Sequence, residues 1–361
     1  TRINRVLEHM AKLQVDSVII KDVTTIRYLT GFTGDSSLLY LDRQQGVLIT
    51  DGRYTEQARN EMKFFKVLEY TPTGAHSIWA AAADLAKNAQ AQVVGFDGAY
   101  YSYDDYTVLH ELLGETYMQS IDFSDIRMIK DKKELDLLLK AASIADEAFI
   151  HLLEDIKPGC TERSLAGRLE YYMRALGSEK ASFDTIVASG VRSALPHGMA
   201  SDKVIEVGDF ITFDFGAVYK GYHSDAARTH GVGEISKEAA LLIERTRESF
   251  FQGMQYARAG RRLYEISGAI GDYAESFGYG VVEELCGHGI GRNLHEDPEI
   301  PNFRQKRRGI KLVPGMTLAV EPMINMGRKD VYWKDDDWTV ATEDGQYSAH
   351  YENTILITDG E

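Results

Sequence analysis

The stretch GDFITFD, residues 208–214, decides the fold, because the chain holds a related stretch in GMTLAVE, residues 315–321. Each stretch opens with glycine and continues through the apolar residues that are typical of a buried strand. Each then delivers a carboxylate six positions after its glycine, Asp214 in the first stretch and Glu321 in the second. This correspondence predicts an internal repeat.

The flanking sequence extends the repeat on both sides. A helical pattern that ends in Gly177 precedes the first stretch, and one that ends in Gly278 precedes the second. After each stretch a further strand carries another acid, Asp225 in YHSDAART and Glu352 in HYENTILIT. Two related halves that each present two acids would converge on one centre by pseudo-twofold packing.

Four acids in apolar strands are costly to bury unless cations or hydrogen bonds compensate them. They would also repel one another and raise each other's pKa values. One divalent metal would leave four carboxylates crowded, whereas two metals can share them. His288 is the best nitrogen ligand, because Gly287 and Gly289 on either side permit close backbone approach. An oxygen-rich set of this kind favours manganese, cobalt or iron over a structural zinc.

Each of these residues has a plainer interpretation when it is taken alone. A strand aspartate is more often salt-bridged than metal-bound, and a single core histidine is more often only hydrogen-bonded. Five such residues in matched positions of two half-repeats favour the metal site.

The spacing of the relevant residues argues against other kinds of active or binding site. The glycines of 287–291 read G-x-G-x-G, which is not a dinucleotide-binding pattern, and the sequence holds no phosphate loop and no nucleophile elbow. Cys160 and Cys286 lack the partners of a thiol protease. The net charge of −15 argues against nucleic acid and anionic membranes as partners, and no apolar run reaches the roughly 20 residues of a membrane span. Two isolated cysteines favour a reducing, cytoplasmic setting.

The 361 residues predict two domains. Residues 1–122 alternate short helices and strands, with a hairpin expected at DRQQG, residues 42–46. A long amphipathic helix expected from about Lys132 until Pro158 follows a polar junction. We therefore expect an α/β (α+β) protein with an N-terminal domain of residues 1–122 and a second domain of residues 123–361.

Longer stretches resemble a known family. SFDTIVASGVRSALPHG (182–198) and GDFITFDFGAVYKGYHSDAART (208–229) are similar to the metallopeptidases with the pita-bread fold, which include aminopeptidase P, prolidase and methionine aminopeptidase. Both stretches resemble the Xaa-Pro branch, and TGFTGDSSLLYL (30–41) with TDGRYTEQA (50–58) resembles its extra, creatinase-like N-terminal domain. The resemblance implies a pita-bread C-terminal domain with a pseudo-twofold repeat, and a homodimer.

The resemblance also implies roles for individual residues. The ligands of two divalent metal ions, with manganese or cobalt favoured and zinc or iron as alternatives, would be Asp214, Asp225, His288, Glu321 and Glu352. His197 and His295 match the two histidines that flank the substrate, and Glu321 matches the proton shuttle. Tyr222 and His350 are expected to contact the peptide substrate.

The C-terminal part departs from the Xaa-Pro pattern. GHGIGRNLHEDPEIPN (287–302) and WTVATEDGQYSAHYENT (338–354) look more like methionine aminopeptidase, and His350 stands where the Xaa-Pro branch usually has arginine. We therefore expect a dinuclear-metal exopeptidase that removes the N-terminal residue, preferentially before proline. The alternatives are a methionine aminopeptidase-like or broader aminopeptidase, and a non-catalytic binding module on the same fold.

Overall fold

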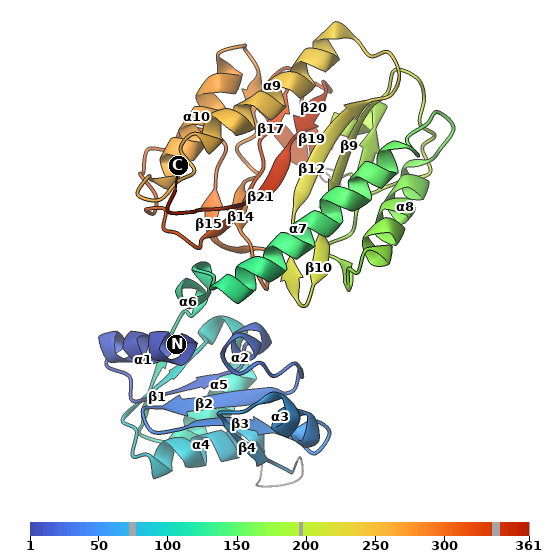
Figure 1. Ribbon diagram of the computed structural model, residues 1–361. Helices are drawn as coiled ribbons and strands as arrows, with labels where there is room; N and C mark the ends of the chain where they lie inside the picture. The colour runs from blue at the N-terminus through green and yellow to red at the C-terminus, as the bar shows by residue number, and fades with distance from the viewer. Residues whose placement is uncertain (72–76, 195–197, 334–339, 361) are drawn as a thin grey trace. The chain divides into compact units, whose positions relative to one another are not determined.

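The structure is a computed structural model that describes residues 1–71, 77–194, 198–333 and 340–360. It divides into two compact units, Thr1–Arg127 and Met128–Glu361 (Figure 1). The predicted domain boundary between residues 122 and 123 lies shortly before this division, ahead of the short helix α6, Ser124–Met128. Each unit has its own apolar core.

The N-terminal unit is built on a six-stranded mixed sheet in the order β4-β3-β2-β1-β5-β6. The hairpin predicted at residues 42–46 is confirmed, because β2 and β3 pair antiparallel around it. The strands are β1 (Ser17–Ile20), β2 (Ser37–Asp42), β3 (Gly46–Thr50), β4 (Lys66–Glu69), β5 (Val93–Phe96) and β6 (Tyr117–Ser120).

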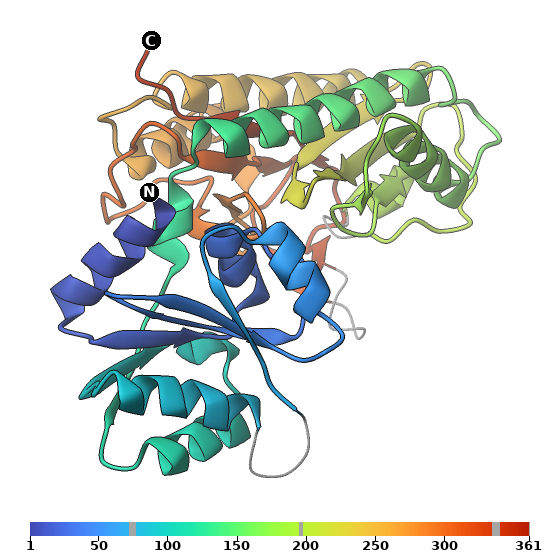
Figure 2. The ribbon, with the colours of Figure 1, turned by 60° about the horizontal axis from the view of Figure 1, so that its bottom comes forward.

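Helices cover both faces of this sheet (Figure 2). Alternate strand residues face opposite sides, so Val18 and Ile20 pack with the helices of one face while Ile19 packs with those of the other. The helices on the first face are α1 (Arg2–Leu13), α2 (Val23–Thr30) and α3 (Thr55–Glu61), and those on the second are α4 (Ile78–Asn88) and α5 (Tyr103–Leu113).

A seven-stranded antiparallel sheet forms the centre of the C-terminal unit, in the order β15-β14-β16-β21-β12-β9-β8. Read outward from the central pair, β12-β9-β8 on one side corresponds to β21-β16-β14 on the other, which is the pseudo-twofold arrangement expected from the repeat. The strands are β8 (Ile186–Ser189), β9 (Phe210–Phe215), β12 (Ala226–Gly231), β14 (Gly287–Gly289), β15 (Glu296–Ile300), β16 (Thr317–Val320) and β21 (Glu352–Leu356).

Two small sheets repeat the same relation. β10 follows β9 as β17 follows β16, and the two sheets have the orders β11-β10-β7 and β20-β17-β13. Their strands are β7 (Lys180–Ala181), β10 (Ala217–Tyr219), β11 (Tyr222–His223), β13 (Gly280–Val281), β17 (Met323–Asn325) and β20 (Ser348–His350); β18 (Val331–Trp333) pairs with β19 (Val340–Thr342).

One pair of helices packs on each half of the large sheet. The phenyl ring of Phe149 stacks on Phe215 and meets Phe213 edge-on, with centroids 5.0 and 5.4 Å apart. Because side chains alternate along a strand, Asp214 between these two phenylalanines points to the opposite face. The helices are α7 (Lys132–Leu153), α8 (Glu162–Ala175), α9 (Lys237–Met254) and α10 (Leu263–Glu275).

The helix predicted from Lys132 ends at Leu153, before Pro158. Within the described ranges, no helix is long and apolar enough to cross a membrane.

Candidate metal centre

The strand register brings the predicted ligands to one level of the large sheet. Ala227 of β12 lies opposite Asp214 of β9 on one side and opposite Glu352 of β21 on the other. In the second half, His288 of β14 lies opposite Ala319 of β16, two residues before Glu321. The acids therefore come from both halves and meet at the centre of the sheet.

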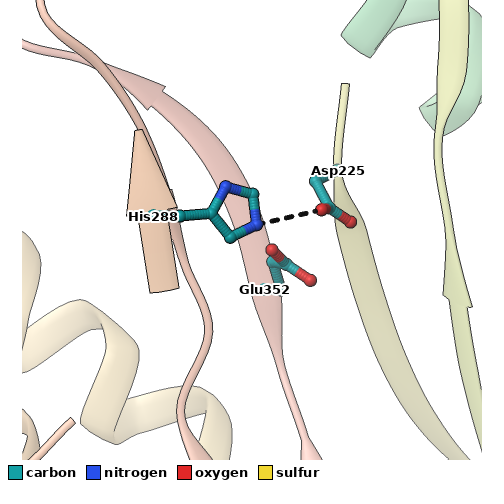
Figure 3. A group of neighbouring side chains, drawn as sticks. All are labelled: Asp225, His288 and Glu352. Carbon is teal, nitrogen blue, oxygen red and sulfur yellow. Dashed lines mark ion pairs between the residues drawn. The ribbon is translucent and has the colours of Figure 1, made fainter. Parts of the chain in front are cut away.

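Short distances join the side chains across the two halves (Figure 3). His288 Nε2 lies 3.5 Å from Asp225 Oδ2 and 3.7 Å from Glu321 Oε1. These separations are too long for ordinary hydrogen bonds, but they suit two donor atoms that each sit about 2.1 Å from a shared ion. The ligand atoms of Asp225, His288 and Glu352 all lie within 4.8 Å of one another, and those of Glu321, His350 and Glu352 form a second such group.

The carboxylates are buried without the partners that buried charges need. Among the described residues, Asp214 Oδ1, Asp225 Oδ1 and Glu352 Oε1 are buried and have no hydrogen-bond partner. Burial raises the pKa of each of these groups, and the neighbouring Asp225 carboxylate further raises the pKa values of Asp214 and Glu352. A divalent cation would satisfy these oxygens and favour their ionised forms, so the residues fit a metal.

His288 is oriented as a ligand by its own backbone neighbour. Its Nδ1 lies 2.9 Å from the Gly289 carbonyl oxygen, and an Nδ1–H donated there leaves the Nε2 lone pair directed at the carboxylates. Burial lowers the pKa of His288, which favours the neutral, ligating form.

The glycines around His288 serve strand packing. A Cβ on Gly287 would lie 2.3 Å from the Ala319 carbonyl oxygen, and one on Gly289 would lie 2.1 Å from the Asp297 carbonyl oxygen. Only glycine lets β14 approach its neighbours so closely, which fixes the position of the His288 ring. The sequence predicted that Gly287 and Gly289 permit close backbone approach. The backbone that comes close to them belongs to the neighbouring strands, at Ala319 of β16 and Asp297 of β15.

A cavity of about 530 Å³ opens over the carboxylates. Its wall combines apolar side chains with two acids outside the cluster, Asp184 and Glu284. The lining residues are Phe183, Asp184, Ile186, Met199, Asp214, Asp225, Glu284, Leu285, Cys286, His288, Leu294, His295, Glu321 and Glu352.

The structure places the other predicted site residues in different surroundings. His295 lines the cavity, with its ring edge-on to His288 at a centroid distance of 4.4 Å, and burial lowers its pKa. The rings of these two histidines therefore face the same space. His197 lies outside the described residues.

Neither residue expected to bind substrate lines this cavity. The imidazole nitrogens of His350 lie 3.8 Å from Glu352 Oε2, 3.9 Å from Glu321 Oε2 and 4.0 Å from Asp214 Oδ2. Tyr222 is buried, and its hydroxyl donates a hydrogen bond of 2.8 Å to Glu134 Oε1. His350 lies close to the carboxylates of the buried cluster, and Tyr222 supports the helix α7.

Sequence reasoning missed the residues of the cavity wall, such as Phe183, Asp184, Glu284 and Leu285. They lie in loops, where apolar and acidic residues follow no periodic pattern. The internal repeat held the signal, because Asp184 precedes β8 much as Glu284 precedes β14, and these strands correspond in the two halves.

The chain belongs to the metallopeptidase family M24, whose model matches residues 136–359, and the creatinase/prolidase N-terminal domain matches residues 2–129. The uncharacterized peptidase YqhT of Bacillus subtilis is 36% identical over 349 residues, which cover 96% of each chain. A methionine aminopeptidase of Clostridium acetobutylicum is 44% identical over 238 residues, which cover 64% of this chain and 95% of that relative.

A solved structure, the Xaa-Pro dipeptidase from Bacillus anthracis, matches with a TM-score of 0.88 and 33% identity over 99% of this chain and 94% of that chain. These findings confirm the expected fold class, the family resemblance and the assignment as a peptidase. The family implies a divalent metal, for which the buried carboxylate and histidine cluster provides ligands.

Proposed function

We propose that this metallopeptidase is a dinuclear exopeptidase that removes the N-terminal residue of a peptide, preferentially where proline follows. The observation that carries the proposal is that two groups of possible ligands, Asp225 with His288 and Glu321 with His350, have Glu352 in common. A carboxylate common to two groups suits a pair of ions that it bridges.

Asp214, Asp225, His288, Glu321 and Glu352 would hold the two ions. Their oxygen-rich donor set favours manganese or cobalt. When bound, the ions would supply Lewis acidity toward the scissile carbonyl group and activate a water molecule.

The protein's own groups would position the peptide and move the proton. The Glu321 carboxylate, which lines the cavity, would take the proton of the attacking water and deliver it to the leaving nitrogen. The His295 imidazole would donate a hydrogen bond to the negative charge that develops on the carbonyl oxygen, and His197 is proposed to act with it.

The cavity supports cleavage at the N-terminus. The substrate's α-amine would lie near the Asp214 carboxylate, while its first side chain would contact the apolar wall at Phe183, Ile186 and Leu294. The chain beyond the scissile bond would then leave through the mouth.

Two observations bear on the residue after the cleaved bond. Similarity to the Xaa-Pro dipeptidase of Bacillus anthracis extends over both units and favours proline. The higher identity of the catalytic unit to a methionine aminopeptidase favours the alternative, removal of methionine or a broader range of residues.

Peptide assays separate these functions. After loading with manganese or cobalt, we expect release of the first residue from Xaa-Pro peptides to exceed release from Met-Ala peptides. Rapid cleavage of Met-Ala peptides alone would replace the proline preference with the methionine alternative. Metal binding without cleavage of any peptide would favour a binding module.

We also propose a homodimer in a cytoplasmic setting. The family resemblance supports the dimer, and the two free cysteines, Cys160 and Cys286, suit a reducing compartment. Light scattering coupled to gel filtration would test the dimer, and a mass of one chain, 40.5 kDa, would contradict it.

A further inference from the structure

Two acids stand at the rim of the cavity, one from each half of the repeat. Asp184 precedes β8, and Glu284 precedes β14. These strands lie toward opposite edges of the seven-stranded sheet. Both side chains belong to exposed residues, and both line the cavity. The rim therefore presents a carboxylate from each side.

The charge of the cavity follows from its lining. Among the described lining residues there are six carboxylates and two histidines, and there is no lysine or arginine. Two divalent ions would carry four positive charges, which would balance the four ligand carboxylates. The negative charges of the two rim acids, Asp184 and Glu284, would remain unbalanced.

This charge matters for the length of the substrate. In a dipeptide the residue after the scissile bond carries the free carboxylate, so that charge must enter the cavity. In a longer peptide an uncharged amide takes its place, and the carboxylate moves outward by about 3.3–3.6 Å for each added residue. A carboxylate that loses water beside two acids, with no cation to receive it, is disfavoured.

We propose that Asp184 and Glu284 select against free dipeptides, so that the enzyme is an aminopeptidase for peptides of three or more residues. The inference rests on the proposed exopeptidase function and adds its substrate class. The same two carboxylates would favour substrates whose third residue carries a positive charge.

The chain offers a matched control in the neighbouring acid, Glu283. It is exposed, its carboxylate pairs with Lys329 Nζ at 2.6 Å, and it does not line the cavity. The backbone N–H of Glu283 donates to Glu284 Oε2 at 3.2 Å, and this bond leaves the charge of Glu284 in place. A variant of Glu283 thus removes one negative charge from the same loop without altering the rim.

The test compares substrates that differ only in the C-terminal charge: Ala-Pro with Ala-Pro-amide, and Met-Ala with Met-Ala-amide. With the manganese-loaded full chain we expect kcat/KM to be about tenfold higher for the amide, from repulsion by two partly solvated charges. In the double variant Asp184→Asn/Glu284→Gln this ratio should fall to about twofold or less, since the repelling charges are gone. Glu283→Gln should keep the ratio of the native enzyme, and 0.5 M salt should reduce it by screening.

Equal rates for acid and amide in the native enzyme would overturn the inference and leave the exopeptidase function standing. An unchanged ratio in the double variant would also overturn it, because the discrimination would then come from other groups. If none of the four substrates released its first residue, the exopeptidase function itself would fail, and the inference with it.

Discussion

Asp22 in the N-terminal unit and three clustered acids in the C-terminal unit are all buried, but they have opposite surroundings. In the N-terminal unit the Asp22 carboxylate accepts hydrogen bonds from the backbone N–H groups of Thr24 and Thr25, both at 3.0 Å. It also accepts one from Arg127 Nη1 at 2.7 Å. Its charge is fully compensated by groups that the unit supplies, as is usual for an acid with a structural role.

In the C-terminal unit, three buried carboxylates keep oxygens that no described residue satisfies: Asp214, Asp225 and Glu352. Burial alone therefore does not distinguish a structural acid from a functional one. The distinction lies in whether the fold supplies the partners or leaves them to a cation.

The largest effect should come from removing one unsatisfied acid. Glu352→Gln takes away the carboxylate common to both ligand groups, so we expect turnover to fall by roughly 10³-fold or more, as when a main electrostatic contribution to the transition state is lost. Metal content by mass spectrometry should fall with it. Glu283→Gln is the matched control, and full activity of the Glu352 variant would refute the metal assignment.

Removing the partner of a satisfied acid should affect stability instead. Arg127→Met leaves the Asp22 charge without its guanidinium, and we expect a loss of about 3–5 kcal/mol in the free energy of unfolding of the N-terminal unit. Urea unfolding measures this loss, and metal content should not change. Arg163→Met, which breaks the ion pair with Asp202 in which both side chains are exposed, should cost about 0–1 kcal/mol, and similar losses in both variants would contradict the comparison.

Metal should stabilise only the unit with unsatisfied acids. At a free metal concentration 100 times the dissociation constant, we expect about 2.7 kcal/mol of added stability from one bound ion. Calorimetry with and without chelator should show the shift in the C-terminal unit alone. An equal shift in both units would show that the two unfold together.

The pH dependence of the free energy of unfolding, measured on the chelated protein, should reveal the same buried acids. Burial raises the folded-state pKa of Asp225 to about 8 and raises those of Asp214 and Glu352 as well. A raised pKa means that the folded form binds protons more tightly than the unfolded chain does. The stability that these protonated acids contribute is therefore complete below the unfolded-state pKa of about 4, and it is lost as pH rises through the folded-state pKa of about 8. Unfolding of the C-terminal unit in the chelated protein should therefore show lower stability at pH 8 than at pH 5, and this difference should shrink after metal loading. The N-terminal unit has a separate pH dependence that metal should not change, because burial raises the pKa of Asp97 to about 7.

A smaller effect than that of Arg127→Met should come from a satisfied acid inside the catalytic unit, Glu134. Tyr222→Phe removes the hydroxyl that donates to Glu134, and we expect a cost of about 1.5–3 kcal/mol in stability, as for a hydrogen bond to a charged group. We expect KM to stay unchanged, since Tyr222 does not line the cavity. An increased KM with native stability would instead support the substrate contact expected from the sequence.

The sequence was most informative where a charged residue stands among apolar residues. Asp214 between two phenylalanines and Glu321 after an apolar run stand out, because burial and charge conflict there. The same acids identified the two half-repeats, from which the pseudo-twofold arrangement of the central sheet was predicted. The hairpin of β2 and β3 was also predictable, from a polar turn between two apolar strands.

Other features leave too weak a pattern. Strands of two or three residues, such as β7, β11 and β13, are too short to show a period, so the small sheets could not be foreseen. Asp184 and Glu284 are exposed loop acids, which are common on any surface. The partners of Tyr222 and His350 depend on pairings between distant segments, and a single sequence does not reveal them.

The central position of β21 has a consequence for how the protein is made. This strand pairs with both β12 and β16, and so joins the two halves of the sheet. The hydrogen bond from Arg228 Nη1 to the Glu352 carbonyl oxygen spans 124 residues of sequence, and pairings of such long range form late. During synthesis on the ribosome, the other three acids of the centre and His288 are translated before the strand that unites them. A nascent chain therefore carries the proposed metal ligands as separate halves, and we expect loading with metal to wait until β21 has emerged.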